Sequence, residues 1–122
     1  MTGVVREREA RVRLTIRGPS GGMRKIDAVI DTGFSSWLTL PRSLIVALRL
    51  TWYTTELAIL ADGNEVLFNV YEAAVTWNRR SRSIFVSESE TIPLIGMALL
   101  EGCELNVQVR QGGKLRRPLL SL

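Results

Sequence analysis

Short runs of alternating apolar and polar residues recur along most of this chain, and they limit the folds open to it. In residues 11–17, RVRLTIR, apolar side chains occupy the even positions and polar ones the odd positions, which is typical of a half-buried strand. Further alternating or short apolar runs occupy residues 25–31, 37–40, 56–61, 65–70, 82–86, 93–95 and 105–109. Glycine-rich turns such as residues 18–22 separate neighbouring runs. The pattern predicts an all-β fold, a small closed barrel-like domain.

Two short helices are expected between the strands. Pro41 suits the first turn of a helix, and residues 42–49 gather their apolar side chains on one side. Residues 97–101 form a second helical segment that Gly102 would end. No linker, repeat or low-complexity stretch divides the sequence, so residues 1–122 are interpreted as one domain.

Two finer predictions concern the strands. The apolar positions change parity between residues 66–70 and residues 75–77, so a bulge is expected between Tyr71 and Ala74. At the end of the chain, residues 115–122 are predicted to form an edge strand.

Composition limits the class of protein and its compartment. Hydrophobic residues make up 46% of the chain and charged residues 23%, an ordinary balance for a folded globular domain. No apolar run approaches the roughly 18 residues of a membrane span, and residues 1–14 lack the apolar core of a signal peptide. The single cysteine, Cys103, excludes an internal disulfide and a cysteine-cluster metal site. We therefore expect a cytoplasmic protein with no membrane partner.

The complete absence of histidine narrows the possible chemistry. It excludes Ser-His-Asp and Cys-His catalysis, histidine-ligated zinc and histidine general bases. An enzyme built on this chain must use carboxylates, lysine or tyrosine. The chain has only three aspartates, Asp27, Asp31 and Asp62, so few residues could carry a reaction, and neither a metal nor a cofactor is expected.

The net charge of +4 comes mostly from arginines, which gather in residues 6–13, 79–82 and 110–117. One interpretation is a patch for nucleic acid or an acidic partner. The other is the solvated faces and hairpin ends of strands. Few aromatic residues lie among these arginines, and no nucleic-acid-binding signature accompanies them. The second interpretation is favoured, and a basic nucleic-acid-binding module is the less favoured alternative.

The candidate catalytic residue is Asp31, in the sequence Asp31-Thr32-Gly33. It directly follows the strand-like residues 25–30, where a carboxylate is costly unless it is hydrogen-bonded or functional. A lone Asp-Thr-Gly is weak evidence, because the same three residues also suit an Asx-type turn at the end of a strand. The surrounding motifs decide between the two interpretations.

Three motifs together resemble the retropepsin-like aspartic proteases of retroviruses, LTR retrotransposons and bacteria. The first is VIDTG at residues 29–33, which follows an N-terminal hairpin. The second is LADG at residues 60–63, which opens a central hairpin. The third is PLIGMALL at residues 93–100, similar to the Leu-Gly-Met-Asp-Trp-Leu pattern of retrotransposon-type members. The resemblance covers nearly the whole chain.

The resemblance implies an assembly and a reaction. Loops from two copies of the chain would meet at the two-fold axis of a homodimer and cleave a peptide or protein substrate. Asp31 would be the catalytic acid/base, Thr32 would fix the loop across the axis, and Gly33 would let the substrate backbone approach. The implied substrate-binding residues lie beside this loop, at the tip of a flap and behind the loop: Phe34, Ser35, Asp62, Gly63, Asn64 and Ile95. Ile95 and Gly96 would also pack behind the loop.

Elementary electrostatics agrees with such a shared site. Two carboxylates about 3 Å apart cannot both ionise easily, so the pair shares a proton. One member then activates a water as general base while the other polarises the scissile carbonyl as acid. Neither Asp27 nor Asp62 lies in a second Asp-Thr-Gly, and Asp27 is about 13 Å from Asp31 along the same strand. One chain therefore cannot form the pair alone.

Several positions depart from the family's pattern. Phe34 stands where many members have alanine, Ser35 where retroviral members have an aspartate, and Met97 where they have its arginine partner. Ala98 replaces the aspartate of the retrotransposon pattern. No catalytic group is lost, so an active aspartic endopeptidase is the favoured prediction. A catalytically weak or inactive dimer that binds peptides or proteins is the alternative, since the bulk of Phe34 would narrow the substrate site.

Overall fold

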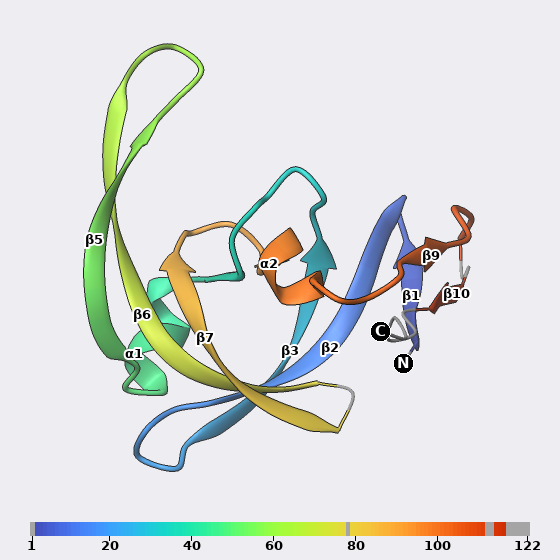
Figure 1. The fold of residues 1–122 in the computed structure, drawn as a ribbon, viewed down its shortest axis with the longest axis horizontal. Helices are drawn as coiled ribbons and strands as arrows, with labels where there is room; N and C mark the ends of the chain where they lie inside the picture. The colour runs from blue at the N-terminus through green and yellow to red at the C-terminus, as the bar shows by residue number, and fades with distance from the viewer. Residues whose placement is uncertain (1, 78, 112–113, 117–122) are drawn as a thin grey trace.

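The computed structural model describes residues 2–77, 79–111 and 114–116. Most of this chain is strand, and its helices are short (Figure 1). The strands are β1 (Thr2–Arg6), β2 (Glu9–Arg17), β3 (Met23–Ile30), β4 (Leu38–Leu40), β5 (Thr51–Ile59), β6 (Glu65–Trp77), β7 (Arg80–Glu88), β8 (Leu94–Ile95), β9 (Asn106–Val107) and β10 (Lys114–Arg116). The helices are α1 (Arg42–Ala47) and α2 (Met97–Leu100). The predicted all-β class with two short helices is confirmed.

The described strands form one sheet that curls back on itself. Their order is β5-β6-β7-β4-β8-β3-β2-β1-β10-β9, and an additional pairing joins β2 to β6. That pairing sets residues 15–17 of β2 against residues 74–76 of β6. The long strand β6, which also pairs with β5 and β7, thereby closes the sheet into a barrel-like body (Figure 1).

The core fills the inside of this curled sheet. Along β2, Val12, Leu14 and Ile16 are buried while the arginines between and after them face outward, as the alternation predicted. The other buried members of the same cluster come from both helices, from the segment between α1 and β5 and from the neighbouring strands: Ala28, Leu38, Leu40, Ile45, Leu48, Leu50, Ala73, Val75, Trp77, Ile84, Val86, Ile95, Leu99 and Leu100. Burial of this apolar surface, at about 25 cal/mol per Å², is the main source of stability.

The prediction of a bulge between Tyr71 and Ala74 of β6 is wrong. Strand β6 pairs with β7 without interruption there, and the register shift lies on β5, between Trp52 and Thr54. The change of parity along β6 has another cause. Val70 is buried outside the core cluster and the later residues are buried inside it, so they are covered on opposite faces of the strand.

The last described strand, β10, ends at Arg116 and pairs with β1 and β9. The edge strand predicted for residues 115–122 therefore lies largely outside the described residues. Within the described part of the chain, no helix is both long and apolar enough to cross a membrane.

Candidate active site

The segment Asp31-Thr32-Gly33 forms a tight loop between β3 and β4. The N–H of Asp31 donates to the carbonyl of Ile95 at 2.9 Å, and the carbonyl of Asp31 accepts the N–H of Phe34 at 3.1 Å. In addition, the carboxylate oxygen Oδ1 of Asp31 accepts the N–H of Gly33 at 2.9 Å. These three bonds fix the carboxylate on a defined backbone, while its Oδ2 accepts no hydrogen bond from the described residues.

A second segment, residues 93–98, supports the loop from behind. Within it, β8 lies between β3 and β4, parallel to the first and antiparallel to the second. Three N–H groups of this segment donate to carbonyls of residues 34–37, which directly follow the loop. The pairs are Gly96 to Trp37 at 2.9 Å, Met97 to Phe34 at 2.7 Å and Ala98 to Ser36 at 3.0 Å. The predicted Ile95-Gly96 motif thus lies directly against the predicted Asp31 loop, although the two are far apart in the sequence.

Gly96 has no room for a side chain. A Cβ at this position would overlap the carbonyl oxygen of Ser36 and would lie 2.7 Å from Cδ2 of Phe34. The loop and the Phe34 ring therefore pack directly on the Gly96 backbone. This contact explains how the chain accommodates a phenylalanine beside its Asp-Thr-Gly, since the half-buried ring rests on a residue without a side chain.

The site residues predicted near the loop differ in exposure. Asp31 and Phe34 are half-buried, and the exposed members are Thr32, Gly33 and Ser35. Ile95, in contrast, is completely buried. Its inclusion among the substrate-binding residues is therefore corrected, because an inaccessible side chain cannot touch a bound peptide, whereas packing behind the loop agrees with this burial. It supports the loop from the core.

The remaining predicted site residues form the tip of the β5–β6 hairpin. The carboxylate of Asp62 accepts the backbone N–H of Asn64 at 2.9 Å and its side-chain N–H at 2.8 Å. Gly63, between them, has a φ of 86°, in the left-handed region that favours glycine. The hairpin extends away from the rest of the sheet (Figure 1), and no described hydrogen bond joins its tip to the Asp31 loop. The structure therefore does not bring the tip residues into contact with Asp31.

The other two aspartates serve local structure. Asp27 on β3 accepts a hydrogen bond from Nε of Arg13 at 3.0 Å, and this bond lowers the pKa of the Asp27 carboxyl. Asp62 is engaged within the hairpin tip. In the described part of the chain, no group of three or more His, Cys, Asp or Glu residues is arranged to hold a metal ion. Asp31 is therefore the aspartate available for chemistry.

Two residues that the sequence did not single out hold the site together. Thr39 is buried, and its hydroxyl accepts the N–H of Leu94 at 2.9 Å. Arg82 places its guanidinium carbon 5.3 Å from the centre of the Trp37 ring and donates to the carbonyl of Leu99 at 3.3 Å. A polar residue between two leucines was a local signal for Thr39, whereas the contacts of Arg82 are long-range and leave no local signal.

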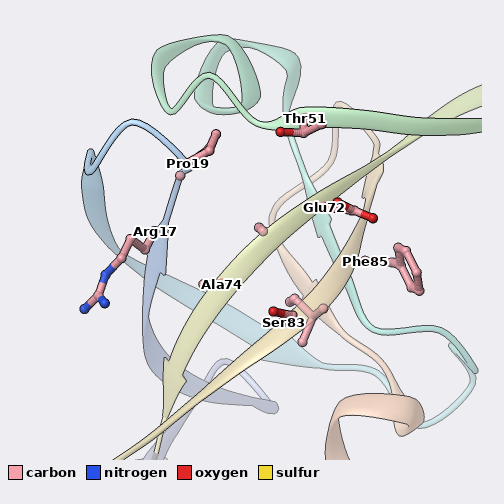
Figure 2. A pocket seen from close by; sticks show the side chains of 10 residues that line it. Arg17, Pro19, Thr51, Glu72, Ala74, Ser83 and Phe85 are labelled. Carbon is pink, nitrogen blue, oxygen red and sulfur yellow. The ribbon is translucent and has the colours of Figure 1, made fainter.

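A cavity of about 370 Å³ is lined by residues outside the Asp31 loop (Figure 2). Residues at the end of β2, in the turn after it and on β5, β6 and β7 line it: Arg17, Gly18, Pro19, Thr51, Glu72, Ala73, Ala74, Ser83, Ile84 and Phe85. None of the predicted site residues lines it. An active site divided between two chains need not form an enclosed cavity in one of them, so this cavity does not argue against Asp31.

Comparison with known proteins establishes the fold. No family model matches the sequence, and no curated protein matches it. The structure is similar to that of a retroviral protease, EIAV protease complexed with the inhibitor HBY-793, with a TM-score of 0.54. The similarity covers 78% of this chain and 88% of the other, at 15% sequence identity. The chain has the retropepsin fold, as predicted.

Proposed function

We propose that this chain is one subunit of a homodimeric aspartic endopeptidase. The observation that carries the proposal is the Asp31 carboxylate, held on a loop by backbone hydrogen bonds from Gly33 and to Ile95 within a retropepsin fold. Asp27 bonds to Arg13 on the sheet and Asp62 lies at the hairpin tip, so the second carboxylate would come from Asp31 of a second copy.

The chemistry follows from two such carboxylates sharing one proton. The ionised member takes a proton from a water molecule, whose oxygen attacks the carbonyl carbon of the scissile peptide bond. The protonated member donates its proton to the carbonyl oxygen. The tetrahedral intermediate then collapses: the carboxyl that took the proton from water donates it to the leaving nitrogen as the C–N bond breaks, and one hydroxyl of the intermediate returns its proton to the other carboxylate, which restores the pair. In each subunit, Oδ1 would stay oriented by the Gly33 N–H, which leaves Oδ2 for the water and the partner carboxylate.

The β5–β6 hairpin supplies the surface that would cover a bound peptide. Several of its apolar side chains are largely exposed: Leu57, Ile59, Leu60, Val66 and Leu67. Exposed apolar groups of this size favour contact with a partner or a substrate. Closure of the hairpin over an extended peptide would bury them and exclude water from the carboxylates.

Cleavage of an unbiased peptide library at several pH values tests the proposed function. We expect pepstatin-sensitive cleavage with an optimum on the acid side, since one carboxylate of the pair must keep its proton. Cleavage that resists pepstatin, or no cleavage by a folded dimer at any pH, would contradict the endopeptidase proposal. The second outcome, combined with peptide binding, would favour the binding-module alternative.

The substitution Gly63→Val tests the role of the hairpin tip. A β-branched residue disfavours the left-handed backbone of Gly63, so the tip should bend less readily over substrate. We expect kcat/KM to fall about tenfold, equivalent to about 1.4 kcal/mol. The matched control is Gly21→Val, at a φ of 88° in the turn after β2, also with open space around it. Equal effects of the two substitutions on kcat/KM would contradict a role for the hairpin tip in substrate binding.

A further inference from the structure

A second hollow, of about 240 Å³, lies on the outer face of the β1–β2–β3 sheet, and arginines dominate its lining. The lining residues are Gly3, Val4, Arg6, Arg11, Arg13 and Asp27. Strand register explains why they meet: Val4 of β1 pairs with Arg11 of β2, and Arg13 of β2 pairs with Asp27 of β3. Arg11 and Arg13, two positions apart, project from the same face of β2.

The arginines of this pocket have more donors than the protein satisfies. Arg11 donates through Nη2 to Glu9 at 2.8 Å, but its Nε is buried and has no acceptor among the described residues. Arg13 donates through its Nε to Asp27 at 3.0 Å, and Arg6 has no side-chain hydrogen bond or ion pair with a described residue. An acceptor bound in the pocket would give the accessible N–H groups of these arginines hydrogen-bond partners that the described residues do not supply.

The charges converge on one point. The pKa of the Asp27 carboxyl is lowered first by its hydrogen bond from Arg13, and the positive charges of Arg6 and Arg11 add to the effect. Three guanidinium groups therefore act on the same small region. Asp27 and Glu9 neutralise only part of this charge, so a ligand suited to the pocket is an anion.

We propose that Arg6, Arg11 and Arg13 form a binding site for a phosphate-type oxyanion, separate from the Asp31 loop. The planar fork of arginine matches the oxygens of phosphate, and each such bond is charge-assisted. A tetrahedral anion offers acceptors in several directions at once, as three guanidinium groups from two strands require. The pocket volume admits a small anion or one phosphate group of a larger molecule. The site does not depend on the proposed protease activity.

Titration of the wild-type protein with inorganic phosphate, against sodium chloride at equal ionic strength, tests this site. In ¹⁵N–¹H spectra, the Nε–H resonances of Arg6, Arg11 and Arg13 should shift along one saturable curve with phosphate only. Shifts that are the same with chloride would overturn the proposal, because they would report ionic strength alone. This measurement needs no variant and is independent of catalysis.

Two variants distinguish phosphate binding by these particular guanidinium groups from attraction by the overall positive charge of the protein. Arg11→Met keeps the apolar stem, and we expect it to raise the dissociation constant for phosphate about tenfold or more, as loss of a charge-assisted bond predicts. Arg80→Met removes the same charge from an exposed position on β7 and should change the constant less than about twofold. Equal effects of the two substitutions would overturn the proposal. If a single-stranded oligonucleotide competes with phosphate, the natural ligand is the phosphate of a nucleic-acid backbone. If it does not compete, the ligand is a small free anion.

Discussion

When wild-type and Asp31→Asn chains are unfolded together and refolded, the total proteolytic activity of the mixture should be proportional to the square of the wild-type fraction. The reason is that only dimers with two Asp31 carboxylates share a proton in the required way. Random pairing at a constant total chain concentration makes the fraction of such dimers equal to the wild-type fraction squared. A dimer with one asparagine should be at least about a hundredfold slower, the usual cost of losing a general acid or base.

Two controls make this experiment decisive. Asp31→Asn alone should give a folded dimer by sedimentation and circular dichroism, since Asn also accepts the Gly33 N–H through its side-chain oxygen. Wild-type activity per chain should fall on dilution near the dimer dissociation constant. Total activity that is linear in the wild-type fraction, or full activity of a monomer, would contradict the shared site. Asp31 would then need a partner within its own chain, where Asp27 and Asp62 are already engaged.

Much of the fold was predictable because the signals were local. The alternation of residues 11–17 reports which side chains face the core, and β2 buries its apolar positions accordingly. The turn chemistry of Asp62-Gly63-Asn64 requires only neighbouring residues, and the hairpin tip lies there. A loop at Asp31 was likewise predictable from a short motif after a strand, whereas its interpretation as a catalytic residue depended on the resemblance of three motifs to a known family.

Long-range features were not predictable by the same reasoning. Nothing in the sequence of β8 says that it lies between β3 and β4, because that placement depends on segments far apart in the chain. The parity change near Val70 has the same origin: it marks a change in which face of β6 is covered, and a single sequence cannot distinguish this from a bulge.

Gly96→Ala should be among the most damaging single-methyl additions to this protein. The new Cβ would overlap the Ser36 carbonyl, and that carbonyl is fixed by the N–H of Ala98 at 3.0 Å. A backbone oxygen cannot rotate aside like a flexible side chain, so residues 34–37 must shift as a unit. We expect a loss of about 3 kcal/mol in the free energy of unfolding, at the upper end for overpacking, measured by urea denaturation.

Two matched glycine variants show whether this loss is specific to the site. Gly22→Ala adds the same methyl where it meets only ordinary contact, 3.7 Å from Leu48, and should be within about 0.5 kcal/mol of wild type. Gly18→Ala would overlap the Leu48 carbonyl, in the turn after β2, and should destabilise the fold about as much as Gly96→Ala. Only Gly96→Ala should also lower the activity of the chains that remain folded, because it displaces the Asp31 loop through Ser36 and Phe34. A stable and fully active Gly96→Ala protein would show that residues 95–98 do not position the Asp31 carboxylate for the proposed reaction.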